Sequence, residues 1–274
     1  QRVLLESAPP STANGFPLGT GVRISTVERY YDALVQKQLV NAGTTASYDE
    51  TKAEVLQQIE PVFNEIAQDG LGASITSFFD SWQDLSLNPT GLAERQAVLA
   101  RAQIMTDQFH YVDRTLSDTI VAQNDALVPI SDDVNRMLNE IAIQNGQIKT
   151  TEQVYGNANE MRDHRDYLIR QLSENMGVKY TENTDGTTDV FVTRGAVTVY
   201  LVKGTQAGSL SLSAPPANYT VTAHDAVVPA TTAVVDNLMY TSTDGGKLWA
   251  TLQMRDTYLP DYQLKVNTDR KSVV

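Results

Sequence analysis

A seven-residue rhythm of apolar side chains runs from Tyr48 to Met176 and constrains the fold more than any other feature of the sequence. The apolar positions follow one another at alternating steps of four and three residues, which holds them on one stripe of an α-helix. Helices with such stripes bury them by packing lengthwise against one another. The stripe members are Leu71, Ile75, Phe78, Trp82 and Leu85, then Val98, Ala102, Met105, Phe109, Val112 and Leu116, then Ile130, Val134, Met137, Ile141, Gln144 and Ile148.

Prolines divide this helical region into segments. Asn88 and Pro89 end the first helix and can begin the second, because proline is tolerated in the first turn of a helix. Pro129 lies between the second and third stripes, where we expect it to break the helix and leave two long helices packed as an antiparallel pair. Pro61, further upstream, predicts a kink or a helix boundary.

A further helix is expected from about Asn159 to Met176, closed by Gly177 in a left-handed cap. This helix contains the densest polar run of the chain, which extends from Arg162 to Asp166. At helical spacing Arg162 can pair with Asp166, and Asp166 with Arg170, for a few tenths of a kcal/mol each, roughly. We therefore interpret the run as solvated or packed rather than catalytic.

Residues 1–24 are expected to form an extended arm, because prolines and glycines leave no room there for a helix. Val3–Leu5 and Val22–Ile24 are candidates for short strands on its flanks. The arm should therefore be extended rather than helical.

We place the start of the first helix at Ser25, because Ser25 and Glu28 have the spacing of a capping box. The helix should run to about Ala42, where Gly43 is expected to stop it.

After the last heptad helix the hydrophobic period changes from helical to alternating. Alternating segments on both sides of the Asn183–Gly186 turn and of Gly195 predict a small antiparallel meander. Residues 204–246 are rich in Thr, Ser, Ala, Pro and Gly, and within them Tyr219–Thr222 and Val234–Tyr240 are the best candidates for strands.

A returning helix is expected from Lys247, which Pro260 kinks or ends, and the tail Lys265–Val274 has no periodic signal. The fold class predicted is α+β: an elongated antiparallel bundle of long heptad helices with a smaller β-hairpin and meander region. The expected organisation is an arm over 1–24, a helical rod domain over 25–176, a β-rich region over 177–246, and a returning helix and tail over 247–274 that pack on the helical domain.

Charge and composition exclude several classes of partner and chemistry. The formal net charge is −12 with a pI near 4.6, which makes nucleic acids and anionic membranes poor partners. The chain has 0 cysteines, so disulfides, thiolate metal sites and a cysteine nucleophile are excluded. No stretch approaches the ~20 apolar residues that span a bilayer.

No motif of the sequence indicates catalysis, a cofactor or a metal. Gly19–Gly21 lacks the third glycine of a dinucleotide-binding turn, and Gly246-Lys247 lacks the other elements of a phosphate loop. His110, His164 and His224 are too scattered to suggest a zinc site, and we expect each at a surface or an interface. We predict no catalytic residue, no cofactor and no metal ligand, and conclude that the chain is not an enzyme.

Taken together, the motifs of the chain resemble the flagellar hook-associated protein 1 family (FlgK type), which forms the hook–filament junction. The matches span residues 1–260 in the family's order. They are Gln1–Glu6 with Ala8–Pro10, Gly21–Arg23, Val27–Arg29 with Tyr31-Asp32, Gly70-Leu71, Phe78-Phe79 with Trp82–Leu85 and Asn88-Pro89, Arg95–Leu99, the D-x-R-D-x-L stretch of Asp163, Arg165, Asp166 and Leu168 followed by Leu172, and Gly245-Gly246 with Arg255-Asp256 and Leu259-Pro260.

The resemblance implies a structural component of the bacterial flagellum that is exported through the flagellar type III pathway to the outside of the cell. It implies a ring between hook and filament that acts by subunit contacts and mechanical adaptation, with the hook protein, the second junction protein and neighbouring copies of itself as partners. Family members also have terminal helices that pair as coiled coils, and we expect this chain to lack both. A central fragment of this kind is expected to be monomeric, and the export chaperone would bind the missing C-terminal part.

The interface residues expected from the arm are Gln1, Arg2, Val3, Leu4, Pro9 and Pro10, because an extended segment presents unpaired backbone groups. The resemblance gives Asp163, Arg165, Asp166 and Leu172 a structural role. Two alternatives stay open: the second hook–filament junction protein, or a secreted carbohydrate-binding or hydrolytic module on a helical stalk. The last would use Trp82, Trp249 or tyrosines as sugar platforms, but Trp82 is expected to be buried on its helical stripe.

Overall fold

The computed structural model describes residues 2–9, 11–13, 16–18, 20–63, 70–194, 196–213, 218–227, 232–235 and 242–273. The helices are α1 (Ala33–Phe63), α2 (Leu71–Leu87), α3 (Leu92–Tyr155), α4 (Asn159–Asn175), α6 (Ser242–Gln253), the π-helical turn η1 (Met254–Tyr258) and α7 (Leu259–Val273). The strands are β1 (Arg2–Ser7), β2 (Ser11–Ala13), β3 (Phe16–Leu18), β4 (Val22–Glu28), β5 (Lys179–Glu182), β6 (Thr188–Arg194), β7 (Val197–Lys203), β8 (Gln206–Ala207), β9 (Ser209–Leu212), β10 (Val221–His224) and β11 (Thr232–Val234).

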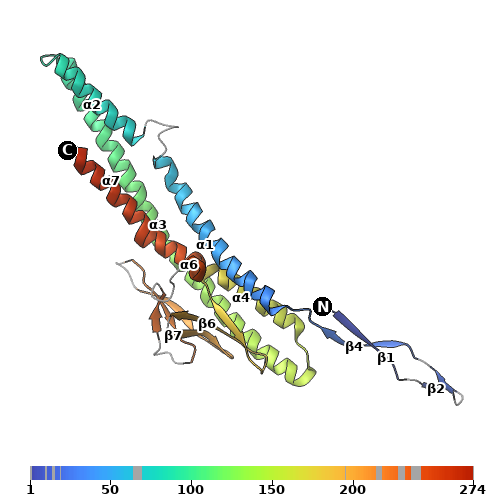
Figure 1. Ribbon diagram of the computed structural model, residues 1–274. Coiled ribbons are helices and arrows are strands. Elements are labelled where there is room, and N and C mark those ends of the chain that lie inside the picture. The colour runs from blue at the N-terminus through green and yellow to red at the C-terminus, as the bar shows by residue number, and fades with distance from the viewer. Residues whose placement is uncertain are drawn as a thin grey trace.

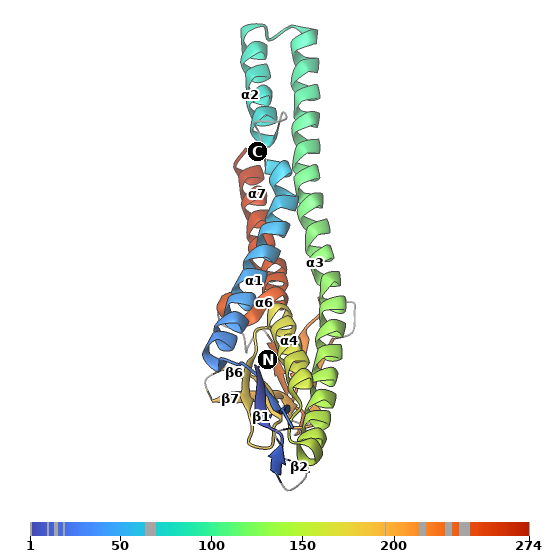
Figure 2. The same ribbon diagram turned by 90° about the vertical axis from the view of Figure 1, so that its right-hand side faces the viewer.

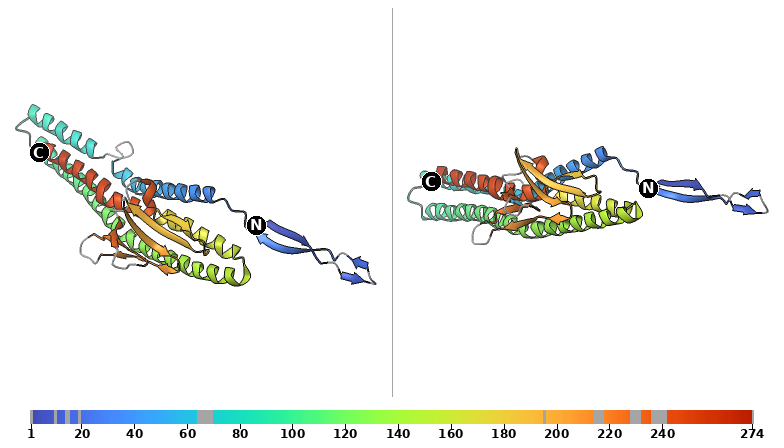
Figure 3. Two further views of the ribbon diagram at one scale, coloured as in Figure 1. Left: turned by 60° about the horizontal axis from the view of Figure 1, so that its bottom comes forward. Right: turned by 90° about the horizontal axis from the view of Figure 1, so that it is seen from below.

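These elements form a long rod of helices with a β-stranded arm at one end (Figure 1). Helix α3 runs the length of the rod, with α2, α7, α1 and α4 arranged along it and the β region against the half that is remote from α2 (Figure 2). The arm continues beyond the helices at the opposite end from α2 (Figure 3). The α+β class and the elongated helical bundle predicted from the heptad pattern are confirmed.

Helix α3 is continuous through Pro129, so the predicted break into an antiparallel pair is wrong. Its 64 residues give a length of about 96 Å at 1.5 Å per residue. Proline removes one backbone donor and crowds the preceding turn. Here Leu127 and Ile130 are buried on either side of it, and this packing holds the helix together.

Helix α1 begins at Ala33 rather than at Ser25, and it does not stop at Gly43. Ser25 lies in strand β4, which pairs with β1, and the capping residue is Asp32. Its Oδ1 accepts hydrogen bonds from Leu34 N at 2.9 Å and Val35 N at 3.1 Å. Ser25 and Glu28 have the spacing of a capping box, but the pairing of β4 with β1 places both in a strand.

Gly43 is tolerated inside α1 because the helix packs closely on α4 there. Thr44 Oγ1 donates to Ser173 O at 2.9 Å, and Val40 is buried one turn earlier. Glycine costs a helix interior about 1 kcal/mol relative to alanine, which these contacts offset. Pro61 lies inside α1, and residues 64–69, which follow the last helical residue Phe63, lie outside the described residues.

The left-handed cap predicted at Gly177 is instead found at Gly156, where α3 ends with φ of 75°. Helix α4 ends at Asn175 with an extended Met176, whose N donates to Leu172 O. Met176 is fully buried, so the chain leaves α4 by inserting a side chain into the core rather than by a glycine turn.

The predicted apolar stripes build two cores. One contains Val55 and Ile59 of α1, Phe109 and Leu116 of α3, and Leu259 of α7. The other joins the rest of α3 to α4, α6 and the β region, with Leu138, Ile141, Leu172, Leu201 and Leu248 among its fully buried members. Helix α3 thus contributes to both cores along one continuous face.

Two predictions for α2 and the C-terminus need correction. Trp82 is 50% exposed rather than buried: Leu71, Ile75 and Phe78 pack on the core formed with α1, α3 and α7, whereas the later part of α2 extends past α1 and α7 (Figure 2). The segment after Pro260 is helical, not irregular: Leu259, Tyr262 and Val266 recur at helical spacing and pack in the core that contains Val55 and Phe109. Pro260 follows the π-helical turn η1, from which α7 continues without a break, and the wider π turn accommodates the proline inside the helix.

The β region matches the predicted meander. Strands β5, β6, β7 and β8 form one antiparallel sheet in that order, and β9, β10 and β11 form a second. The Asn183–Gly186 segment turns between β5 and β6, with Gly186 at φ of 82°. The predicted strand at Tyr219–Thr222 is found as β10 at Val221–His224, and that at Val234–Tyr240 overlaps β11 only at Val234; residues 236–240 and Gly195 lie outside the described residues.

Three asparagines of α3 attach the β region to the rod. Asn145 Nδ2 donates to Thr188 O at 2.8 Å and to Gly204 O at 2.6 Å, while its Oδ1 accepts from Thr188 N at 3.0 Å. Asn135 binds both the N and the O of Leu210 at 2.7 and 2.9 Å. At the next site Asn124 Oδ1 accepts from Tyr219 N at 2.8 Å.

These asparagines, which we call the asparagine ladder, are about three helical turns apart and so face the same side of α3. Each side-chain amide hydrogen-bonds to backbone groups of the β region. The β region is therefore held in one register along the helix.

Substitution of Asn145 by alanine should lower the free energy of unfolding by about 3 kcal/mol, because it leaves backbone groups of Thr188 and Gly204 buried without partners. Urea unfolding followed by circular dichroism measures the change. The control is Asn139→Ala: Asn139 is exposed on α3 and bonds only to a carbonyl of its own helix, so the change should stay within about 0.5 kcal/mol. Equal losses in both variants would contradict the role of the ladder.

Candidate functional site

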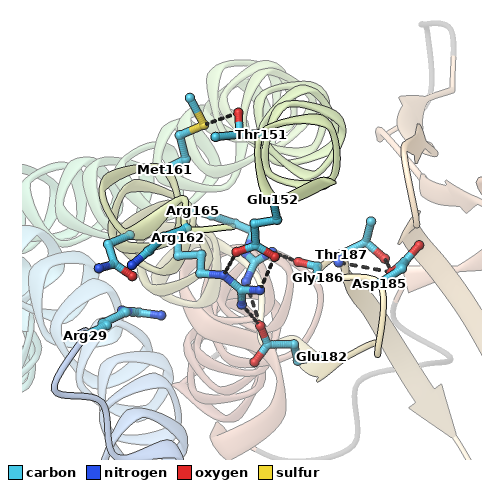
Figure 4. Close-up of polar contacts among 12 residues, drawn as sticks. Arg29, Thr151, Glu152, Met161, Arg162, Arg165, Glu182, Asp185, Gly186 and Thr187 are labelled. Carbon is cyan, nitrogen blue, oxygen red and sulfur yellow. Dashed lines mark hydrogen bonds and ion pairs between the residues drawn. The ribbon is translucent and has the colours of Figure 1, made fainter. Parts of the chain in front are cut away.

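The polar run from Arg162 to Asp166 lies in α4 at the point where the arm, α3 and the β5–β6 turn meet (Figure 4). Residues Asp163 and Asp166 are one helical turn apart and point to the arm, whereas Arg165 points into the interior. In the D-x-R-D stretch the two aspartates therefore bind the arm on one side of the helix turn, and Arg165 binds the interior on the other. We call this group, with Arg29, Asn145, Glu152, Arg162 and Glu182, the α4 hub.

Arg165 is 1% exposed and is the most deeply buried charge in the hub. Its Nη1 donates to Gly186 O at 2.6 Å and to Asn145 Oδ1 at 3.2 Å, and its Nη2 lies 3.3 Å from Glu182 Oε1. Burial lowers the pKa of Arg165 from its ordinary value, while Asp166 and Glu182 oppose the shift. Arginine stays protonated in proteins, so this charge requires the partners it has.

Arg162 closes the hub on its solvent side. It forms a bidentate pair with Glu152 at the end of α3, with Nε–Oε1 and Nη2–Oε2 distances of 2.6 and 2.8 Å, and it also binds Glu182. These bonds lower the pKa of the Glu152 carboxyl. Gly186 leaves room for this pair, because a Cβ there would lie 2.7 Å from Glu152 Oε2.

The arm is fastened to α4 at its base. Arg29 Nε lies 2.5 Å from Asp163 Oδ1, and Arg29 Nη2 also binds Asp166 Oδ2. Two further bonds, from Asn157 Nδ2 and Asn159 Nδ2, both reach Val27 O at 2.6 Å. The arm therefore leaves the rod from a fixed base.

The helical i, i+4 pairs expected from the sequence, Arg162 with Asp166 and Asp166 with Arg170, are not what the structure shows. Arg162 binds Glu152 and Glu182, and Asp166 binds Arg29. These partners come from other elements because the hub is an interface between elements rather than a solvated helix face. The fourth family-motif residue, Leu172, is fully buried in the core.

The predicted interface residues lie on the arm as expected, within a β-hairpin. Arg2, Val3 and Leu4 belong to β1, which pairs with β4, and Pro9 O accepts a bond from Thr20 Oγ1 at 2.7 Å. Gln1 and Pro10 lie outside the described residues. The inner backbone edges of β1 and β4 are thus paired, and only their outer edges are free for another chain.

Apolar side chains of the arm are exposed. Val3, Leu5, Val22 and Ile24 are 50–70% exposed, and Tyr30 at the base is 91% exposed. An isolated two-stranded hairpin is marginally stable in water, so apolar residues exposed on one are typical of a contact surface.

At the opposite end, the α2–α3 hairpin also exposes apolar residues. They are Phe79, Trp82, Leu87, Leu92 and Leu99. Both ends of the rod therefore carry apolar surface.

The histidines lie at surfaces or between elements. His110 is exposed, His164 Nε2 lies 2.9 Å from Glu140 Oε1, and His224 Nε2 lies 2.7 Å from Ser211 Oγ. Within the described ranges, no three His, Asp or Glu side chains converge in a way that could hold a metal ion. Over those same ranges no helix is sufficiently long and apolar to traverse a bilayer.

Sequence reasoning missed the residues that bind the hub to other elements. Arg29 lies 134 positions from Asp163, and Glu152 and Glu182 lie on the elements before and after α4, so no helical spacing indicates them. The sequence gives one weak indication of a buried polar site at Asn145, because the preceding residue, Gln144, is the polar member of the third stripe. The structure shows that Asn145 is fully buried and that Gln144 is only partly so.

The Asp163→Asn, Asp166→Asn double variant should loosen the arm while leaving the helical rod folded, because it removes both negative charges that pair with Arg29. Trypsin cleavage after Arg29 should become severalfold faster, as measured by mass spectrometry of a limited digest. Asp133→Asn, which removes an exposed partner of Arg136, should leave that cleavage unchanged. An unchanged rate in the double variant would show that the arm is held by other contacts.

Asp185 gives the hub region an acid-sensitive contact. Its carboxylate accepts from Thr187 Oγ1 at 2.6 Å, Thr187 N at 3.1 Å and Lys149 Nζ at 3.0 Å, and these bonds lower its pKa to about 2 from 3.8. Because the folded-state pKa is depressed, this stabilisation is present above pH ~4 and is lost as the pH falls towards ~2.

Asp185→Asn should therefore lose less stability than the wild type between pH 5 and pH 3, as measured by urea midpoints at both values. Asp132→Asn, at an exposed position of α3, is the matched control and should retain the wild-type loss. If Asp185→Asn loses as much stability as the wild type between pH 5 and pH 3, the acid sensitivity does not come from Asp185.

Comparison with known proteins agrees with this architecture. The family model described as "Flagellar hook-associated protein FlgK helical domain" matches residues 56–270. The chain is 31% identical over 185 residues to flagellar hook-associated protein 1 of Bacillus subtilis, covering 68% of this chain and 36% of that protein. With the protein of the same description from Salmonella typhimurium it shares 29% identity over 250 residues, covering 90% of this chain and 45% of that protein.

A solved structure, that of the flagellar hook junction protein FlgK from Burkholderia pseudomallei, resembles the fold with a TM-score of 0.66 and 25% sequence identity. The likeness covers 80% of this chain and 38% of that one. The chain therefore spans less than half the length of each of these relatives. Because the family model covers most of its residues, this chain belongs to the FlgK family of flagellar hook-associated proteins, whose helical domain it contains.

Proposed function

We propose that the chain is part of a structural protein that joins the flagellar hook to the filament. The observation that carries this proposal is the combination of the family's helical domain with an arm that is fixed at its base and apolar on its surface. A junction needs extended faces that make many weak, repeated contacts. A rod with apolar surface at both ends provides such faces.

The proposed partners are the hook protein, the second junction protein and neighbouring copies of the same protein in a ring. The interface on the arm would include Arg2, Val3, Leu4 and Pro9, together with Gln1 and Pro10. Export through the flagellar type III pathway, a position outside the cell, and binding of an export chaperone to a C-terminal part belong to the same proposal. The names of the relatives, a hook-associated protein 1 and a hook junction protein, support this proposal.

The proposed mechanism is mechanical rather than catalytic. Helix α3 is a stiff element that can transmit torque along the rod, and the α4 hub connects it to the arm. Support for a non-catalytic role comes from the hub itself, because Arg29, Arg162 and Arg165 are bound to carboxylates of the same chain. Charged groups engaged in this way are typical of structural ion-pair networks.

The carbohydrate-binding alternative has one observation in its favour, since Trp82 is half exposed. However, its ring packs edge-on against Phe78, with ring centroids 6.3 Å apart. Trp249 packs against the core that joins α3 to α4, α6 and the β region. The curated relatives also favour the first junction protein over the second.

Assembly on hooks tests the proposal. The protein in its full natural length is added to hooks isolated from cells that lack their own hook-associated protein 1, and the hook ends are examined by electron microscopy. Rings at the distal end that then permit flagellin to polymerise would support the junction role. Bare hook ends, under conditions where the Salmonella typhimurium relative binds, would refute it.

In the same assay Val3→Asp, Leu5→Asp should reduce hook binding at least tenfold, because it places charges on the apolar surface of the arm. Val227→Asp, at an equally exposed position in the β region, is the control. Equal binding by the arm variant and the control would exclude the arm as the contact surface.

A further inference from the structure

A groove of about 320 Å³ lies between α1 and strand β5. Lys37 and Asn41 of α1 line one side, and Lys179 and Tyr180 of β5 line the other. Val40, which is almost fully buried, and Phe191 of β6 add apolar surface. The groove thus combines apolar contacts with two ammonium groups.

Neither lysine is paired with a carboxylate in the described part of the chain. Lys149, Lys203 and Lys265 each lie within 3.3 Å of an aspartate oxygen. By contrast, Lys37 is exposed on α1, and Lys179 Nζ donates to the hydroxyl of Thr193 at 3.0 Å. In a chain of net charge −12, two cations without carboxylate partners on facing sides of one groove indicate an anionic occupant.

Strand β5 is the edge strand of its sheet, with β6 as its neighbour on one side only. The other edge can pair with an added strand, which is how many domains bind extended peptides. In an added strand alternate side chains point the same way. Acidic residues at alternate positions would therefore all face the lysine side of the groove.

We propose that this groove binds an acidic polypeptide segment in extended conformation, which adds to the free edge of β5 and places its carboxylates against Lys37 and Lys179. The lysines select the charge of the segment, and Phe191, the cross-strand partner of Lys179, adds apolar surface on the same face for the methylene groups of the acidic side chains. This inference does not depend on the junction role, because it rests on the groove alone.

Fluorescence anisotropy with a labelled peptide tests the proposal. The probe is an octapeptide of alternating valine and glutamate, and its reference is the same peptide with glutamine in place of glutamate. The wild-type chain should bind the glutamate peptide saturably and at least tenfold more tightly than the reference, with weaker binding as salt is added. Absence of saturable binding, or equal binding of both peptides, would overturn the proposal.

Charge reversal separates the groove from the general charge of the protein. Lys37→Glu, Lys179→Glu should weaken binding at least tenfold. Arg101→Glu, Arg114→Glu changes the net charge equally at exposed positions of α3 and should leave the affinity within twofold. Both lysines are exposed, so circular dichroism should show an unchanged fold. Equal losses in the two double variants would overturn the assignment to this groove.

Backbone methylation tests the strand addition. A glutamate peptide that is N-methylated at alternate residues, on the edge that faces β5, should bind at least tenfold more weakly because it cannot pair with β5. If it binds as well as the unmodified peptide, the groove recognises charge alone and the proposed strand addition is wrong.

Discussion

Burial of the Arg165 charge is the constraint on which the arrangement of arm, rod and β region depends. A guanidinium that is 1% exposed must keep its charge and find acceptors, and it finds them on three other segments. Asn145 belongs to α3, Glu182 ends β5, and Gly186 lies in the turn that follows. Moving any of these segments would take a partner from the buried charge, and breaking a buried ion pair costs about 3 to 5 kcal/mol.

The neighbours of Arg165 extend this constraint outwards. Asp163 and Asp166 flank it in sequence but point to the other side of α4, where they hold Arg29 at the base of the arm. One turn of helix thus connects the arm to the interior. On α3 the asparagine ladder continues the attachment of the β region beyond the hub. The result is a rod whose appendages have fixed positions, as a protein that works through repeated contacts requires.

Much of the fold could be predicted from the sequence because heptad stripes and alternating strands are local signals. The stripe from Val98 to Leu116 and the meander after residue 177 are found where expected. Local signals failed where packing between distant segments decides the outcome. Pro129 and Gly43 did not end their helices because buried neighbours hold them, and Ser25 entered a strand because β1 pairs with β4.

The same reasoning explains what could be predicted of the hub. The D-x-R-D stretch was identified as structural, but its acceptors were expected on its own helix. Arg29 lies 137 positions from Asp166, and no periodicity connects residues at such a distance. Trp82 shows a different failure: its stripe is helical as predicted, but the packing of α2 on α3 leaves the Trp82 side chain half exposed.

Hydrogen exchange of Arg165→Met tests the central role of this side chain most directly, because methionine keeps much of the volume and removes the charge. We predict faster exchange in two places together, the Glu182–Thr188 turn and the Val27–Tyr31 base of the arm, with no change in α3 around Val112. Arg136→Met, which removes an exposed arginine from α3, should change neither place. Faster exchange at the turn alone, or the same pattern in Arg136→Met, would contradict the claim that Arg165 couples the arm to the interior.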